Sequence, residues 1–233
     1  MAINLIFTSF FKALSQMGDA RFRRVFWLGI LLTIALLVAA YAGLLWIAEA
    51  IAGPDAHTEV LGRVVDLGDL LTFSSLVFML VLSFFLMIPV ASAITSMFLD
   101  EVADAVEARH YPALAPAPGA SFGDALRDTL GFLAIIIAAN LLAFVIYAFL
   151  PYLSLFIFFG LNGFLLGREY FQLAAMRRIG RDRAKALRKR HSATIWAAGV
   201  LMALPLVVPI LNLFIPILGA ATFTHIFHGL ERR

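Results

Sequence analysis

Three arginines directly before a long apolar run are the strongest candidates for chemistry in this sequence. Arg21, Arg23 and Arg24 precede the uncharged stretch 25–48. Free backbone N–H groups and the dipole at a helix N-terminus favour an anion, and guanidinium groups add planar, multidentate donors that suit a tetrahedral oxyanion. Gly18 upstream would let the backbone approach such an ion closely. The pattern indicates an anion site, and a topology signal is the simpler alternative.

Other charged and polar residues could line a polar path through the protein. Glu107 and Arg109 lie on an expected helix after the second long apolar run, where a solvated helix face is the simpler interpretation. Asn140, Asn162 and Asn212 interrupt apolar runs. Amides inside membrane hairpins are usually satisfied by helix–helix or turn hydrogen bonds. Glu107, Arg109 and Asn212 are therefore candidate path residues for which a structural role stays open.

Motifs for enzymatic chemistry are missing from the sequence. It contains no HExxH, GxSxG, Walker A or GxGxxG pattern, so neither an enzyme nor a bound cofactor is predicted. It also has no cysteine, which excludes disulfides and thiolate metal sites. His225 and His228 are spaced so that both could face one metal ion. Glu231 is the only carboxylate near them in sequence, so packing at the membrane interface is favoured and no metal site is predicted.

The composition is that of a membrane protein. Of the 233 residues, 62% are hydrophobic and 14% are charged, whereas a soluble domain has about 25% charged residues. So few polar groups cannot cover a soluble surface. Lysines and arginines retained on the cytoplasmic side explain the net charge of +3, and no nucleic-acid partner is predicted. The apolar runs are spread along the whole chain, which indicates one membrane domain over residues 1–233.

Four long stretches without charged residues would position the candidate residues. Residues 25–48 and 70–99 contain 24 and 30 residues; a membrane crossing needs about 20, so each predicts one transmembrane helix. Residues 129–167 and 192–230 contain 39 residues each, which is short of the roughly 44 needed for two crossings and a turn. Turn residues in the middle of each, such as Pro151, predict a helical hairpin. Such a hairpin either crosses twice with short helices or enters the membrane and returns.

The charged segments between these stretches predict the orientation. Residues 1–24 and 168–191 are rich in Lys and Arg and residues 49–69 are acidic, so the positive-inside rule places the first two in the cytoplasm and the third outside. Two crossings return the chain to the side on which it started, so residues 100–128 are placed inside. Both termini are predicted to be cytoplasmic. Residues 1–24 have apolar residues at helical spacing, which predicts an amphipathic helix that lies in the membrane interface or packs on the protein. The segment 168–191 is expected to be a basic cytoplasmic helix.

Three short sequences suggest a known family. The most specific is VVPILNLFIPILGAATF at Val207–Phe223. The others are EAR at Glu107–Arg109 and the pair Arg23-Arg24 after a Ser-Gln-x-Gly turn. With these motifs the chain resembles the CysZ sulfate permeases, within the wider etoposide-induced membrane-protein superfamily. The resemblance covers nearly the whole chain by the order and spacing of its segments.

The resemblance implies both a fold and a function. The fold would be an all-α integral membrane protein with two long transmembrane helices, two helical hairpins that partly penetrate the membrane, and a small helical cytoplasmic head. It would assemble as homodimers or higher oligomers. Arg23 and Arg24 would bind sulfate, and Arg21 and Gly18 belong to the same candidate site. The protein would be a channel or gradient-driven permease of the bacterial inner membrane, without nucleotide hydrolysis, that supplies sulfur for cysteine synthesis.

A different class of function is also compatible with the residues. A non-transporting membrane protein could organise the envelope or bind anionic lipid, with the basic segment 168–191 and the first helix in contact with the headgroups. Liposome flux separates the two classes. A sulfate leak that depends on Arg23 supports transport, and lipid binding without flux supports the alternative.

Overall fold

The computed structural model describes residues 2–52, 57–60, 63–66, 77, 98–119 and 122–232. The chain divides into two compact units, one made of residues 1–26 and 96–233 and the other of residues 27–95. Of the second predicted crossing, only residues 77, 98 and 99 are described, so the prediction of a transmembrane helix over 70–99 lies outside the described residues.

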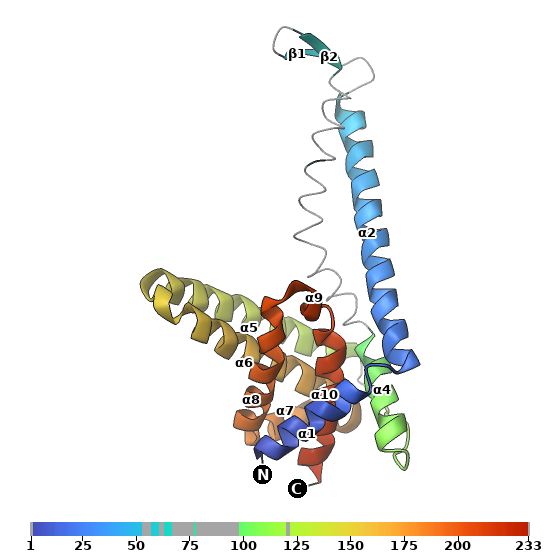
Figure 1. Ribbon diagram of the computed structural model, residues 1–233, viewed down its shortest axis with the longest axis vertical. Helices are drawn as coiled ribbons and strands as arrows, with labels where there is room; N and C mark the ends of the chain where they lie inside the picture. Colours follow the sequence, from blue (N-terminus) through green and yellow to red (C-terminus); the bar gives the residue numbers. More distant parts are fainter. Residues whose placement is uncertain are drawn as a thin grey trace. The chain divides into compact units, whose positions relative to one another are not determined.

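Most of the long helix α2 (Ala20–Ala52) belongs to the smaller unit and is drawn in blue in Figure 1. Its segment Ala20–Gly43 is long and apolar enough to cross a membrane, in agreement with the crossing predicted over 25–48. Trp27 and Leu31 are each 63% exposed. Large apolar side chains on the outside of a long helix fit contact with lipid tails.

A short β-hairpin is the one departure from helical structure among the described residues of the smaller unit. Strands β1 (His57–Val60) and β2 (Arg63–Asp66) pair antiparallel. Thr58 lies opposite Val65, and both are residue types with a high strand propensity. The predicted all-α fold did not include this hairpin, since the segment was expected only as an acidic loop.

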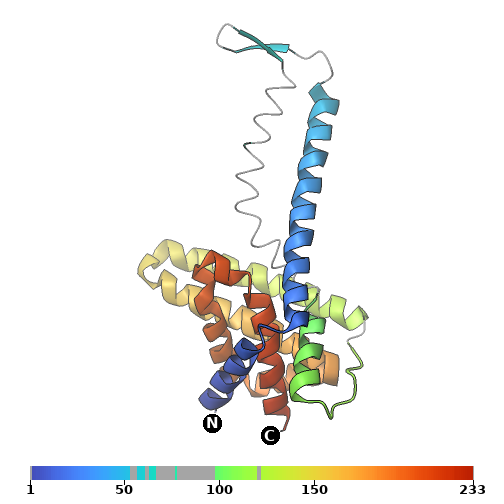
Figure 2. The same cartoon turned by 45° about the vertical axis from the view of Figure 1, so that its right-hand side comes forward.

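The larger unit is built from helices joined by short turns. Its N-terminal helix packs along its C-terminal helix, so the two ends of the chain lie side by side (Figure 2). Its elements, besides the start of α2, are α1 (Ala2–Ser15), α4 (Leu99–His110), α5 (Phe122–Phe149), the 3-10 turn η1 (Pro151–Leu153), α6 (Ser154–Ile179), α7 (Arg181–Arg190), α8 (Ser192–Ala203), the 3-10 turn η2 (Leu204–Val207), α9 (Pro209–Asn212) and α10 (Ile215–Glu231).

Helix α10 forms the centre of the larger unit. It packs against α1, α4 and α6, and every residue from Ile215 to His228 is buried. Phe223 stacks on Tyr170 of α6. A helix of 17 residues is about 26 Å long, which is shorter than the ~30 Å hydrocarbon core. Helix α10 is therefore a core helix of the protein.

Helices α6 and α8 approach each other at glycines. A Cβ on Gly199 would lie 1.9 Å from the carbonyl oxygen of Gly163, which leaves no room for a side chain. The two backbones are therefore in direct contact, as at membrane helix interfaces made of small residues. Nearby, Trp196 Nε1 donates a hydrogen bond to the Gly160 carbonyl at 3.0 Å, which helps to set the register of the two helices.

The stretch 129–167, predicted as a hairpin, falls within α5 and α6, and the chain reverses at Pro151. Both helices extend beyond the uncharged residues, because a charged side chain does not by itself end a helix. Helix α6 ends where Gly180 adopts a φ of 76°, a left-handed conformation that glycine accepts without strain. The segments Gly123–Phe149 and Pro151–Ile179 are each long and apolar enough to cross a membrane. Length thus permits two full crossings, and partial penetration stays a prediction.

The stretch 192–230 also reverses direction, but its arms are shorter. Helix α8 has 12 residues, or about 18 Å, and α10 is about 26 Å long. Pro205 and Pro209 lie in η2 and at the start of α9, within the reversal. Neither arm is long enough to cross a ~30 Å core as one straight helix. The arm lengths agree with a hairpin that enters the membrane and returns, and partial penetration stays a prediction for this stretch too.

Helix α1 packs on the protein, which is one of the two alternatives that its amphipathic pattern left open. One face packs on the protein, with Ile6, Ser9 and Ala13 buried. The opposite face leaves Ile3 and Phe11 71% and 59% exposed. Large exposed apolar side chains on a surface helix are typical of the membrane interface, and the interfacial position of this face of α1 stays a prediction.

Candidate functional site

Glu107 on α4 lies at the centre of a buried ion-pair cluster. It is 4% exposed, and each of its carboxylate oxygens has two partners. Arg177 donates to it through Nη1 at 2.8 Å, and Arg178 donates through Nε at 2.9 Å and Nη2 at 2.6 Å. His228 Nε2 lies 2.9 Å from Oε1. The solvated position that the sequence favoured for Glu107 is wrong, because three side chains from α6 and α10 enclose it.

The cluster keeps Glu107 ionised far into the acid range. Burial by itself raises the pKa of the Glu107 carboxyl. Hydrogen bonds from His228 and Arg178, and the positive charges of the arginines, outweigh burial and lower the pKa from 4.5 to about 2. The group therefore acts as a permanent negative charge that holds α4, α6 and α10 together.

The local sequence explains why these helices meet at charged groups. Asp100, Asp104 and Glu107 lie on one face of α4, because residues spaced by three and four share a helix face. Arg177 contacts all three: Nε lies 3.6 Å from Asp100, Nη2 bonds Asp104, and Nη1 bonds Glu107. Cations near a helix C-terminus also complement its dipole, and Arg177 and Arg178 are in the last turn of α6.

Sequence reasoning missed the partners of Glu107. Arg177 and Arg178 were assigned to the basic cytoplasmic segment, and His228 to interfacial packing. One signal was available, namely the acidic face of α4. An acidic face beside a basic helix end indicates a pairing between the two elements, but it does not indicate which arginine or histidine takes part.

The structure does not bring the three predicted path residues together. Arg109 follows Glu107 on α4, but its side chain is exposed. Asn212 is the last residue of α9, before α10 begins, whereas Glu107 contacts His228 near the other end of α10. The helical residues between these points span roughly 20 Å. A path that used both Glu107 and Asn212 would run along α10, and this role stays a prediction.

The asparagines inside α5 and α6 are satisfied within their own helices. Asn140 Nδ2 donates to the Ile136 carbonyl at 2.9 Å, and Asn162 Nδ2 donates to the Phe158 carbonyl at 2.8 Å. Both bonds reach the residue four positions earlier, so these amides have the structural role that is usual in membrane helices.

The predicted anion-binding arginines lie in the first turns of α2. Arg21, Arg23 and Arg24 have exposed side chains, whereas Phe22 and Val25 are 1% and 0% exposed. The helical repeat thus turns the apolar residues to the protein and the arginines outward. Their side chains are free to meet an anion, and their assignment as a sulfate site stays a prediction.

Asp19 caps the start of α2. Its Oδ1 accepts the backbone N–H of Arg21 at 2.9 Å, and its Oδ2 accepts a bond from Gln16 Nε2 at 3.3 Å. A first-turn amide that could face an anion thus already has a carboxylate partner. Gly18 has no atom within 4 Å of the position of a Cβ, and its backbone is not left-handed. An anion here would be bound mainly by guanidinium groups.

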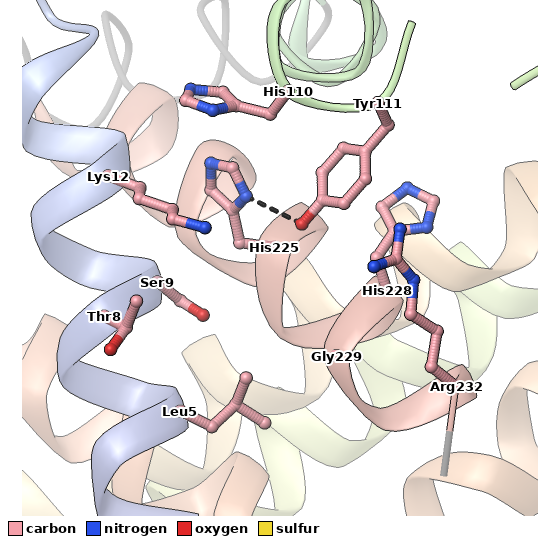
Figure 3. Close-up of a pocket in the computed structure, with 10 residues that line it drawn as sticks. All are labelled: Leu5, Thr8, Ser9, Lys12, His110, Tyr111, His225, His228, Gly229 and Arg232. Carbon is pink, nitrogen blue, oxygen red and sulfur yellow. Dashed lines mark hydrogen bonds between the residues drawn. The ribbon is translucent and has the colours of Figure 1, made fainter. Parts of the chain in front are cut away.

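The two histidines considered as metal ligands have other partners. His225 Nδ1 lies 3.0 Å from the Tyr111 hydroxyl, marked by the dashed line in Figure 3, and His228 belongs to the buried ion-pair cluster. Burial lowers the pKa of His225, and the neighbouring His110, Lys12 and His228 lower it further, to about 3. Within the part of the chain that is described, no group of three or more His, Asp or Glu side chains could hold a metal ion.

The fold and the charged cluster define a class of protein. This is a helical membrane protein that contains membrane-length apolar helices, which are parts of α2, α5 and α6, and helices joined by buried ion pairs. A family model described as sulfate transporter CysZ/etoposide-induced protein 2.4 matches residues 9–216. The match covers most of the chain, so the chain belongs to this family, as its motifs predict. Searches of curated proteins and of solved structures each find no match.

Proposed function

We propose that this protein transports sulfate across the bacterial inner membrane and supplies sulfur for cysteine synthesis. It acts as a channel or gradient-driven permease without nucleotide hydrolysis. The observation that carries this proposal is the family match over residues 9–216, because the family description names a sulfate transporter. Three membrane-length apolar helices among the described residues support it.

In this proposal, Arg23 and Arg24 capture sulfate at the start of α2, with Arg21 in the same turn. Their exposed guanidinium groups offer the planar, multidentate donors that an oxyanion needs. Glu107 has a different part, because its carboxylate would repel sulfate. It holds Arg177 and Arg178 in position, and an anion that passes the ion-pair cluster would be attracted by these two arginines.

Sulfate flux into proteoliposomes tests the capture site. Replacing one of Arg23 and Arg24 with Ala removes charge-assisted hydrogen bonds of ~1.5–3 kcal/mol each, so sulfate binding should weaken roughly 10- to 150-fold. Replacing both with Lys keeps the positive charge but removes the planar fork, so binding should also weaken. Arg183→Lys on α7, an exposed arginine far along the chain, is the matched control. Parent-like flux and binding in the double Lys variant would rule out the arginine site.

We also propose that both chain ends face the cytoplasm. The side-by-side packing of α1 and α10 supports a shared side. Because the chain has no cysteine, single cysteines can report topology. A cysteine at Ala56 should react with an impermeant reagent from outside, and one at Lys185 only after the membrane is opened. Reaction from outside at Tyr152, which is 71% exposed beside Pro151, would show that the first hairpin crosses fully.

Assembly as a homodimer or higher oligomer belongs to the same proposal. Hairpins that return within the membrane leave helix ends and turn amides at membrane depth, where unsatisfied polar groups cost several kcal/mol. A neighbouring subunit is a natural cover for them. Native mass spectrometry in mild detergents should show oligomers, and monomers alone in every detergent would contradict the proposal.

One observation favours the alternative of a lipid-binding, non-transporting protein. Helix α7 exposes four basic side chains, namely Arg183, Lys185, Lys189 and Arg190. Exposed basic residues can bind anionic headgroups at about 1 kcal/mol per residue near the surface. Binding to anionic vesicles without any sulfate flux would support this function and contradict transport.

A further inference from the structure

A cavity of about 270 Å³ lies between α1, α4 and α10, away from the predicted sulfate site. Neither Arg23 nor Arg24 lines it. Figure 3 shows the residues that line it, with Lys12 and Ser9 on the α1 side, His225 and Arg232 across from them, and His110 and Tyr111 above. Its polar lining includes Ser9, Lys12, His110, Tyr111, His225 and Arg232.

The wall of this cavity is positively charged and lacks a compensating acid. Lys12 and Arg232 carry positive charge, and no Asp or Glu is among the lining residues. His228 also lines the cavity, but it is bonded to Glu107, whose charge is already shared by two arginines. Burial lowers the pKa of both His110 and His225, and the charge of Lys12 lowers both further. The charge of Lys12 thus acts on two histidines of the cavity wall.

The cavity wall also contains a buried polar atom without a partner. The Tyr111 hydroxyl and His225 Nδ1 lie 3.0 Å apart and share one hydrogen bond, which leaves Nε2 as the second polar atom of the ring. In the tautomer that accepts at Nδ1, Nε2 carries the proton and is a donor. His225 is 2% exposed, and its Nε2 has no hydrogen-bond partner among the described residues. Buried polar atoms are rarely left unpaired in native structures.

We propose that this cavity binds a tetrahedral oxyanion. Lys12 and Arg232 provide charge-assisted donors, and the Ser9 hydroxyl on the 2% exposed side chain adds a neutral one. The His225 ring, whose Nε2 has no partner among the described residues, lies in the same wall. The required chemistry is shared by free sulfate, free phosphate and the phosphate of a lipid headgroup. A bound anion links α1 to the end of α10. This site goes beyond the proposed transport, because it requires only binding.

Protection of a single cysteine tests the site. Thr8 lines the cavity and is exposed, so Thr8→Cys provides the only thiol in the otherwise cysteine-free full chain. A neutral maleimide should label this cysteine, and millimolar sulfate or phosphate in lipid-free detergent should slow the labelling. Chloride at equal ionic strength is the control for screening, because a spherical monovalent ion does not reproduce the oxyanion geometry.

A matched pair of lysine variants assigns the effect to the cavity. In the Thr8→Cys background, Lys12→Gln removes a charge-assisted donor, so the sulfate concentration that gives half-protection should rise tenfold or more. Lys185→Gln removes the same charge from an exposed position on α7 and should leave protection unchanged. Replacing Arg23 and Arg24 with Gln should also leave it unchanged, which separates this site from the transport site.

Experiments with and without anionic lipid identify the source of the oxyanion. Protection in nanodiscs of phosphatidylglycerol, but not phosphatidylcholine, without added sulfate would assign the site to a lipid headgroup phosphate. Protection by sulfate or phosphate in lipid-free detergent would assign it to a free ion. The proposal is overturned if chloride protects the cysteine as well as sulfate does, or if the Lys12→Gln variant is half-protected at the same sulfate concentration as the parent. It is also overturned if replacing Arg23 and Arg24 abolishes protection. None of these outcomes depends on sulfate flux, so the transport proposal stands or fails separately.

Discussion

Helices α5 and α10 are both apolar arms of hairpins, but they lie in opposite surroundings. Helix α5 has 28 residues and leaves Phe144 and Phe149 73% and 78% exposed. Helix α10 has 17 residues and is buried without interruption from Ile215 to His228. Apolar composition therefore indicates only that a helix avoids water. Length and neighbours decide whether lipid or protein covers it.

The difference has a physical basis in the available partners. Helix α10 is enclosed by α1, α4 and α6, whereas the contacts of α5 are chiefly with α6. An arm as long as α5 can place its apolar side chains against a ~30 Å hydrocarbon core. An arm of about 26 Å with both ends fixed by protein contacts gains more from close packing. The predictions below separate protein-covered positions from the positions that we expect lipid to cover.

The largest difference is expected for two phenylalanines. Phe223→Ala in α10 removes a side chain that is 0% exposed and should lower the free energy of unfolding by about 3–5 kcal/mol. Phe144→Ala in α5 should change it by no more than about 0.5 kcal/mol. Thermal unfolding of both variants in one detergent measures the contrast. An equal loss in Phe144→Ala would mean that α5 is packed against protein, for example against a second subunit.

The next largest effect concerns the buried ion-pair cluster around Glu107. Glu107→Gln leaves Arg177 and Arg178 buried without their shared counter-charge, so stability should fall by about 3 kcal/mol. Asp100 contacts the same Arg177 but is 74% exposed, so Asp100→Asn should cost at most about 1 kcal/mol. Equal unfolding temperatures for the two variants would contradict the central place of Glu107.

Two glycines give a smaller contrast. Gly199→Ala adds a Cβ that would lie 1.9 Å from the Gly163 carbonyl oxygen, so α8 must move from α6 at a cost of about 1–3 kcal/mol. Gly131→Ala in α5 meets no atom within 4 Å and should be neutral, or stabilise by up to about 1 kcal/mol through helix propensity. The unfolding temperature should fall for Gly199→Ala and should stay the same or rise for Gly131→Ala, and size-exclusion profiles of both variants check their integrity. A stable Gly199→Ala variant would show that the close contact of α6 and α8 is not required.

The smallest effect is a pH dependence that is specific to Glu107. Its pKa is lowered in the folded protein to about 2, so its stabilising contribution is complete above the ordinary carboxyl pKa of 4.5 and is lost as the pH falls through about 2. The stability difference between the parent and Glu107→Gln should therefore shrink by about 1 kcal/mol from about pH 7 to pH 4. A constant difference over this range would mean that Glu107 has an ordinary pKa.

Much of the fold could be predicted because hydrophobicity and turn chemistry are local signals. The uncharged stretch 25–48 predicts the membrane-length part of α2, and Pro151 predicts the reversal between α5 and α6. The element bounds differ because helices run on through charged residues until a conformational signal such as Gly180 ends them. The hairpin at 57–66 gave no signal strong enough to be predicted.

The candidate residues also divide into those that the sequence identified and those that only the tertiary structure identified. The sequence by itself determined that this is a membrane protein of its family, and it singled out Glu107 and the arginines before α2. Only the tertiary structure decided that Glu107 is buried between Arg177, Arg178 and His228, and that Lys12 and Arg232 from the two chain ends face one cavity. Hydrophobic periodicity and motifs act over neighbouring residues, whereas ion pairs and cavities join residues 70 or more positions apart, and their partners are set by how the helices pack.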